Sequence, residues 1–252
     1  MLATLAISLA VAGALPDASS INFSEPVRIV EVDIAKLKGE LFRLAWSPDA
    51  REMYLQTVER DKAGSLKDAH HYALALDGTP PRRMDAEPEW AAAYWTRKSA
   101  QAAPARPTFR ITVEDRQQRL TSTATPMGGD LARGAPEAGS GGGEISGAAQ
   151  SQMAHYYTLR LKGEVIGEFV NTVAVPGLTF GWGPESSGLI AFVSQDGRIV
   201  VMDEQGRKRQ VPASRAAVLP AWTDNGGRLA YFERTGKKTA VLKVVEVKQG
   251  KP

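Results

Sequence analysis

The stretch LAWSPDAREMYL, residues 44–55, decides the fold, because two later stretches of the chain repeat its pattern. They read LTFGWGPESSGLIAF at 178–192 and VLPAWTDNGGRLAYF at 218–232. Each copy has an apolar lead-in with a Trp, a short turn of Pro, Asp, Ser, Asn or Gly residues, and a second apolar segment. Short apolar segments joined by such turns are typical of β-hairpins. The sequence therefore predicts a hairpin that recurs along the chain.

A further segment that ends in a charged turn extends the repeat. Segments of this kind start at residues 27, 70, 108, 155, 197 and 239. Their spacing of about 40 residues is typical of propeller blades, whereas leucine-rich repeats are shorter. Apolar and polar residues alternate within them, which argues against helical repeats. We therefore expect an all-β fold, a β-propeller of about five to six four-stranded blades, one of them degenerate.

The three Trp residues of the repeated hairpin are expected to pack between blades. Trp46, Trp182 and Trp222 occupy equivalent positions, and a residue repeated at equivalent positions indicates a repeated structural need. A role in stacking against a ligand is the alternative. Both faces of a propeller blade pack against neighbours, and aromatic and β-branched residues suit such surfaces.

The repeat resembles that of TolB-type, PD40-like propellers, which have an apolar-Trp-Ser-Pro-Asp turn and a later strand that ends in Asp-x-x-Gly. The resemblance is clear over Phe42–Asp77 and Leu178–Val247, weak over Glu87–Leu120, and limited to the last strand over Gln152–Val170. Ala50 stands where the family usually has Gly. Members of this family serve as periplasmic interaction modules, and similar propellers gate serine peptidases. The resemblance thus implies a binding role.

An additional strand at about residues 27–34 is expected to pair near Lys237–Val247. Propellers usually close by pairing strands from the two chain ends, which removes an exposed sheet edge.

The N-terminus indicates export to the periplasm or beyond the cell. Residues 1–20 read as a signal peptide, with an uncharged apolar run from Leu2 to Leu15 and the small residues Ala12-Gly13-Ala14 suited to cleavage. The run lacks a preceding Lys or Arg, so a simple apolar tail is the alternative. The run is short for a membrane span, and no later segment approaches one. Residues 21–252 then form a single propeller domain.

A Gly-rich insertion at residues 127–152 interrupts the repeat. It contains Gly-Ser-Gly-Gly-Gly at 139–143 and few large apolar residues, so we expect a mobile loop. A functional loop over one face of the propeller is the alternative. A phosphate-binding role is excluded by the absence of the G-x-x-x-x-G-K-[ST] pattern.

Charge and composition give no sign of nucleic-acid binding. The chain has 31 Lys and Arg against 28 Asp and Glu, a formal net charge of +3, which fits a mixed solvated surface. The basic groups Arg207-Lys208-Arg209 and Arg82-Arg83 are expected in turns between strands. The chain has no cysteine, so thiol catalysis and disulfides are impossible.

No residue is assigned a catalytic, cofactor-binding or metal-binding role. The three histidines His70, His71 and His155 are expected to be ordinary residues at the starts of strands. A metal site would need them to converge with a carboxylate. Ser186-Ser187 lies in a turn and lacks the context of a nucleophile elbow.

Two classes of function remain open. In the first, the chain is an exported, non-catalytic interaction module that binds a protein or another partner. In the second, it is the accessory or degenerate propeller of a hydrolase or peptidase that lacks its catalytic domain. A self-contained propeller enzyme would need a cluster of His, Arg and carboxylates around a central channel, and the sequence shows no such cluster.

Overall fold

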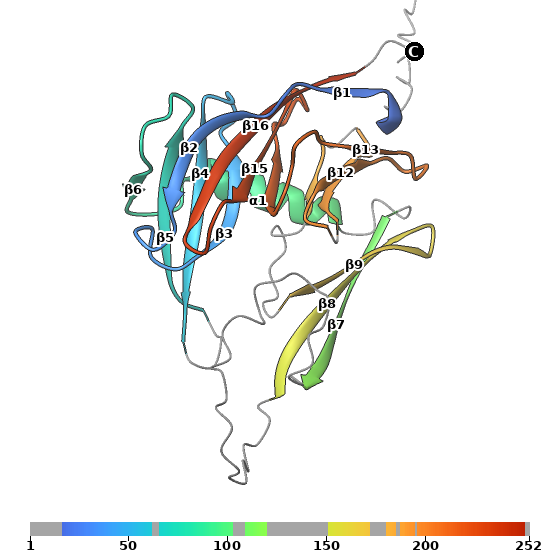
Figure 1. Ribbon diagram of the computed structural model, residues 1–252, viewed down its shortest axis with the longest axis horizontal. Helices are drawn as coiled ribbons and strands as arrows, with labels where there is room; N and C mark the ends of the chain where they lie inside the picture. The colour runs from blue at the N-terminus through green and yellow to red at the C-terminus, as the bar shows by residue number, and fades with distance from the viewer. Residues whose placement is uncertain are drawn as a thin grey trace, which may run out of the picture.

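The protein folds mainly into antiparallel β-strands (Figure 1), as the sequence predicts. The computed structural model describes residues 17–61, 66–102, 109–119, 151–171, 180–184, 187–194 and 196–249. Within these ranges the strands form four sheets, here called sheets I to IV in the order of their first hairpins.

Each sheet is built from segments that follow one another along the chain. Sheet I contains β3 (Glu40–Trp46), β4 (Glu52–Arg60), β5 (Leu66–Ala75) and β6 (Arg82–Met84). Sheet II contains β7 (Phe109–Arg119), β8 (Ser151–Leu161) and β9 (Glu164–Asn171). Sheet III contains β10 (Phe180–Trp182), β11 (Ile190–Val193), β12 (Ile199–Met202) and β13 (Lys208–Gln210). Sheet IV contains β14 (Ala217–Trp222), β15 (Arg228–Arg234) and β16 (Thr239–Gln249), joined by β1 (Ile21–Phe23) and β2 (Val27–Asp33).

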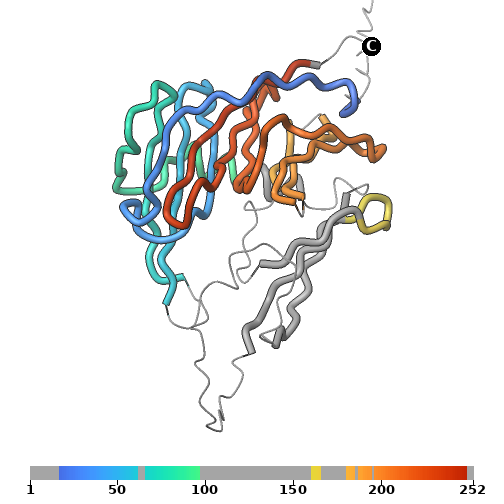
Figure 2. Tube along the Cα trace, in the orientation of Figure 1, coloured from blue at the N-terminus to red at the C-terminus, as the bar shows by residue number. Residues whose placement is uncertain are grey.

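Sheet IV joins the two ends of the chain. Strand β2 pairs with β16, with Asp33 opposite Thr239 and Val27 opposite Val244. Strand β1 pairs with the far end of β16. Figure 2 shows the N-terminal segment in blue beside the C-terminal strand in red. The predicted pairing of residues 27–34 with the C-terminal strand is therefore confirmed.

Sheet IV is buried on both faces because it lies between sheets I and III. Along β15 successive side chains point to opposite faces, as the pleat of a strand requires. Ala230 and Phe232 belong to the apolar core shared with sheet I. Leu229 and Tyr231 belong to the core shared with sheet III. Because both faces of β15 exclude water, the sequence of this strand is nearly continuously apolar.

The repeated Trp residues are buried, as the packing prediction requires. The exposed fractions of Trp46, Trp182 and Trp222 are 2%, 3% and 0%. Trp46 belongs to the core between sheets I and IV, and Trp222 to the core between sheets III and IV. Trp182 lies in a third apolar cluster with Phe180 on sheet III.

The segment after sheet I departs from the predicted repeat. Residues Glu89–Ala102 form an α-helix, α1, where a weak blade is expected from the sequence. A run of three alanines with Glu89 in the first turn favours a helix, which the repeat template conceals. The strands starting near 108 and 155, assigned to separate units, pair as β7 and β8 of one sheet. Where about five to six blades are expected, the described ranges contain four sheets and one α-helix.

Other expectations receive partial answers. The basic groups predicted in turns lie mostly in the short outer strands β6 and β13.

Most of the insertion at 127–152 lies outside the described residues, but its last two residues belong to β8. Residues 1–16 also lie outside, whereas residues 17–20 belong to the folded part. No helix in the described part is long and apolar enough to cross a bilayer.

The buried carboxylate of Asp203 holds the segment at residues 17–20 on sheet III. The short 3-10 helix η1 (Ala18–Ser20) packs beside β13 of sheet III. Oδ2 of Asp203 accepts hydrogen bonds from the backbone N–H of Ala18 at 2.9 Å and from Nε of Arg207 at 2.7 Å. Arg207 also pairs with Asp17 at 2.9 Å. These contacts hold η1 on sheet III while β1 continues into sheet IV.

Candidate functional site

The face of sheet I that points away from sheet IV gathers polar side chains. The register places Arg43 of β3 opposite Gln56 of β4, and Gln56 opposite His71 of β5. Residues directly opposite on antiparallel strands share a face. Tyr54 lies on the same face, two residues from Gln56 on β4.

Helix α1 covers part of this face. Ala45 and Tyr54 of sheet I form an apolar cluster with Ala91 and Tyr94 of the helix. The ring of Trp90 meets Tyr54 edge-on at 6.3 Å between centroids. Helix α1 also lies close to β10, and in Figure 1 it runs behind the sheets from sheet I toward sheet III.

A half-buried arginine lies among aromatic rings at the margin of the helix. The guanidinium carbon of Arg43 is 5.2 Å from the centroid of Phe42 and 5.5 Å from that of Trp95. Both distances fall within the range of cation–π attraction. The rings hold the guanidinium group against the helix and shield part of it from water.

Four polar atoms in this region are buried without a hydrogen-bond partner among the described residues. They are Nε of Arg43, Oε1 of Gln56, Oε1 of Glu87 and Nε1 of Trp95. Gln56 is the most buried of the four residues, with 8% of its surface exposed. A buried polar group left unpaired costs about 1–3 kcal/mol. This set of two donors and two acceptors therefore marks the face as a candidate binding site.

Tyr54 and His71 form a polar pair inside the same face. The Tyr54 hydroxyl lies 2.6 Å from Nδ1 of His71. Burial raises the pKa of Tyr54, the nearby Glu87 raises it further, and Arg43 opposes the shift. The hydroxyl thus stays protonated at neutral pH and shares a hydrogen bond with Nδ1 of His71. The pair fixes the ring beside Gln56.

The histidines lie within strands and not at their starts. His70 and His71 are in the middle of β5, and His155 is in the middle of β8 opposite Asp115 and Asn171. Nε2 of His70 lies 3.0 Å from Oε1 of Glu59 on the neighbouring strand. The prediction that the histidines stand at strand starts is wrong, because β5 and β8 begin earlier than the charged-turn pattern indicates.

No group of three or more metal-ligating side chains occurs in the described ranges. Ser187, the described member of the predicted serine turn, bonds the carbonyl of Pro184 through its hydroxyl at 2.7 Å. Its hydroxyl therefore holds the turn that joins β10 to β11.

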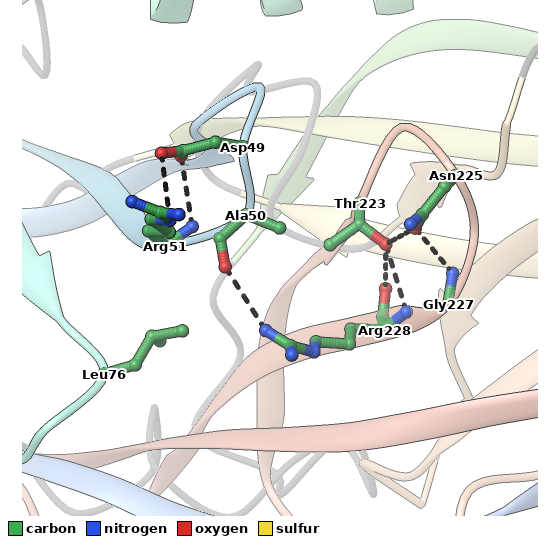
Figure 3. A pocket seen from close by; sticks show the side chains of 8 residues that line it. All are labelled: Asp49, Ala50, Arg51, Leu76, Thr223, Asn225, Gly227 and Arg228. Atoms are coloured by element: carbon green, nitrogen blue, oxygen red, sulfur yellow. Dashed lines mark hydrogen bonds and ion pairs between the residues drawn. The ribbon is translucent and has the colours of Figure 1, made fainter.

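A surface cleft of about 560 Å³ lies where sheets I and IV meet (Figure 3). It is lined by the β3–β4 and β14–β15 turns, and by Leu76. Arg228 donates from Nη1 to the carbonyl oxygen of Ala50 at 3.2 Å, which ties the two turns together. Asp49 and Thr223 use their side chains to bond their own turns. The cleft is therefore a structural junction whose polar groups are engaged.

The two turns at this junction have the same design. Oγ of Ser47 and Oγ1 of Thr223 each accept a backbone N–H from the start of the next strand, that of Glu52 at 3.1 Å and that of Arg228 at 3.0 Å. The fourth residue of each turn has a positive φ, 55° at Ala50 and 72° at Gly226. Glycine suits this position of the turn, since it adopts positive φ without strain.

Comparison with known proteins gives no assignment for this chain. No protein-family model matches it, and no curated protein matches it significantly.

The candidate site is one that sequence reasoning missed. The segment EPEWAAAYW at 87–95 does carry a signal, because Trp90 and Tyr94 are four residues apart and so share one face of a helix. The period is short, and it lies inside the weak part of the propeller repeat at Glu87–Leu120. Arg43 and Gln56 give no signal, since their pairing across β3 and β4 depends on a shift in register between Leu41 and Arg43.

Proposed function

We propose that the protein is an exported, non-catalytic interaction module of the TolB-type propeller class that binds a polypeptide partner. The partner binds at the margin between sheet I and α1. This surface, the α1 patch, consists of Phe42, Arg43, Gln56, Glu87, Trp90 and Trp95.

The observation that carries the proposal is the combination of aromatic rings, an arginine and unpaired polar atoms in the α1 patch. Residues that dominate binding at protein interfaces are enriched in Trp, Tyr and Arg. Trp90, Trp95 and Arg43 are each half-buried, so they are held in place and still reach solvent.

The arrangement of the sheets supports the propeller class. The first strands of three sheets, β3, β14 and β10, lie side by side in that order. A Cβ on Gly181 of β10 would lie 2.2 Å from the carbonyl oxygen of Pro220 on β14, so glycine is required for this approach. Closely spaced first strands and a sheet shared by both chain ends are features of propeller blades. The apolar run from Leu2 to Leu15 supports export.

Site-specific photocrosslinking tests the proposal. A benzoyl-phenylalanine is introduced at Phe42, and as a control at the exposed Lys237 in the turn between β15 and β16. We expect Phe42 to capture a discrete polypeptide in intact cells, and Arg43→Ala to abolish the capture. Equal labelling from both positions, or no product from Phe42, contradicts the proposal. The identity of the captured protein also distinguishes the two classes of function. An enzyme as partner indicates the accessory propeller of a hydrolase, whereas another partner indicates a free-standing interaction module.

A further inference from the structure

We propose that one end of sheet IV binds an anionic phospholipid surface. This end, the basic rim, consists of exposed basic residues in and beside the β2–β3, β13–β14 and β15–β16 turns: Lys36, Lys38, Arg215, Arg234, Lys237 and Lys238. The inference does not rest on the proposed polypeptide partner, because none of these residues belongs to the α1 patch.

Backbone hydrogen bonds hold the three turns of the basic rim next to one another. The N–H of Ile34 donates to the carbonyl oxygen of Lys238 at 2.7 Å, which joins the β2–β3 and β15–β16 turns. The N–H of Arg234 donates to the carbonyl oxygen of Ala216 at 3.1 Å, which adds the β13–β14 turn. Figure 2 shows the first two turns together, one in blue and one in red. The basic side chains are therefore carried at neighbouring positions on one end of the sheet.

Neighbouring carboxylates leave most of the positive charge of the basic rim unpaired. Lys36 lies 4.0 Å from Asp33, which is a distant ion pair. The other five basic residues form no ion pair within the ranges that the structure describes. Two acidic residues beside the rim are paired with other cations, Glu233 with Lys243 at 2.8 Å and Asp196 with Arg198 at 3.0 Å. The rim therefore presents a concentrated positive charge to solvent.

The composition of the basic rim favours a lipid surface over an acidic protein. Most of its residues are lysines, and lysine is depleted at protein interfaces, whose centres are apolar and aromatic. Leu37, between two of the lysines, has only 6% of its surface exposed and so offers no apolar anchor. Lysine side chains are long and flexible, and they attract lipid phosphates without apolar contacts.

The placement of the charges favours an extended surface over a single small anion. The cleft of Figure 3 lies beside the β14–β15 turn, at the opposite end of sheet IV, so the basic residues do not line it. They are instead carried by three separate turns. A membrane surface offers many phosphates at once, so cations distributed in this way can each face one.

Sedimentation of the full-length protein with phospholipid vesicles tests the inference. One set of vesicles contains equal parts of phosphatidylglycerol and phosphatidylcholine, and the other contains phosphatidylcholine alone. The rim variant combines Arg215→Gln, Lys237→Gln and Lys238→Gln. A matched control loses the same charge from exposed positions in the β8–β9 turn and β13: Lys162→Gln, Lys208→Gln and Arg209→Gln. Unchanged thermal melting by circular dichroism shows that both variants fold.

We expect the protein to bind the anionic vesicles and not the neutral ones. Binding should be lost as the salt concentration rises from about 0.1 M to about 1 M, because salt screens exposed charges. One basic residue near an anionic surface changes the binding constant about fivefold, so the rim variant should bind about a hundredfold more weakly. The control variant should lose less than about tenfold, since its charges lie away from the contact.

Four results overturn the inference. Equal loss of binding in the two variants shows that net charge alone accounts for it. Equal binding to neutral vesicles shows insertion of an apolar segment. No binding of the unaltered protein to anionic vesicles removes the lipid surface as a partner. Stronger binding to polyglutamate than to vesicles, at equal negative charge, shows that the rim receives an acidic polypeptide. The crosslinking test is unaffected, since a lipid surface gives no polypeptide product from Lys237.

Discussion

The indole Nε1 of Trp46 donates a 3.0 Å hydrogen bond to the carbonyl oxygen of Ala221. The bond joins β3 of sheet I to β14 of sheet IV, across 175 residues of chain. Ala221 directly precedes Trp222. This single hydrogen bond therefore connects the segments that carry two of the repeated Trp residues. Trp46 thus holds sheets I and IV together by both packing and hydrogen bonding.

Replacing Trp222 by Ala should destabilise the protein by about 3–5 kcal/mol, because the fully buried ring leaves a large cavity. This is a large share of a total stability of about 5–15 kcal/mol. Trp46→Phe is the milder comparison, since it loses one hydrogen bond and should cost about 1–3 kcal/mol. Urea unfolding followed by circular dichroism measures both. A Trp222→Ala protein with an unchanged midpoint would show that this ring does not support the core.

Replacing Ala50 by Gly should stabilise the protein by about 1 kcal/mol, because Ala50 has a φ of 55° that glycine adopts without strain. The reverse change, Gly226→Ala, tests the equivalent turn. It should destabilise, since φ is 72° and the added Cβ would lie 2.7 Å from Cγ of Pro184. Thermal melting of the two variants should move in opposite directions. Movement in the same direction would refute the shared design of these turns.

Replacing Asp203 by Ala should cost about 3 kcal/mol, because its buried carboxylate accepts from Ala18 and Arg207 in a partly buried network. The N-terminal segment should also become accessible to protease before the rest of the protein unfolds. Limited proteolysis with N-terminal sequencing measures this loss. Asp196→Ala, at an exposed turn of the same sheet, is the control and should leave the segment protected.

Stability should fall in acid through the turn carboxylates. Hydrogen bonds from serine hydroxyls lower the pKa of Asp49 and Asp196, and a backbone N–H of Thr79 lowers the pKa of Asp77. A lowered folded-state pKa stabilises the protein above the unfolded value of 3.8, and the effect is lost as pH falls through the folded value.

Melting temperatures measured from about pH 5 to about pH 2 should therefore decline, and the three Asp→Asn changes together should flatten the decline. The same slope in the variant would mean that other carboxylates dominate.

Local patterns in the sequence determined most of the β-structure. Strand residues at period two, the Trp-containing hairpins and the apolar segment at 27–34 each carry their own signal, since strand formation depends on side chains that fit a pleated, buried surface. The pairing of the chain ends also followed from the sequence, because a lone terminal strand leaves an exposed edge unless it joins the last sheet.

Only the tertiary structure decided where the polar residues meet. The register shift in β3 sets Arg43 beside Gln56, and the placement of α1 brings Trp95 and Glu87 to the same face. Neither depends on residues near one another in the sequence. Local periodicity reports which face of a strand is buried, whereas the partner that buries it is chosen by long-range packing. For that reason the strands of this protein were predictable and the α1 patch was not.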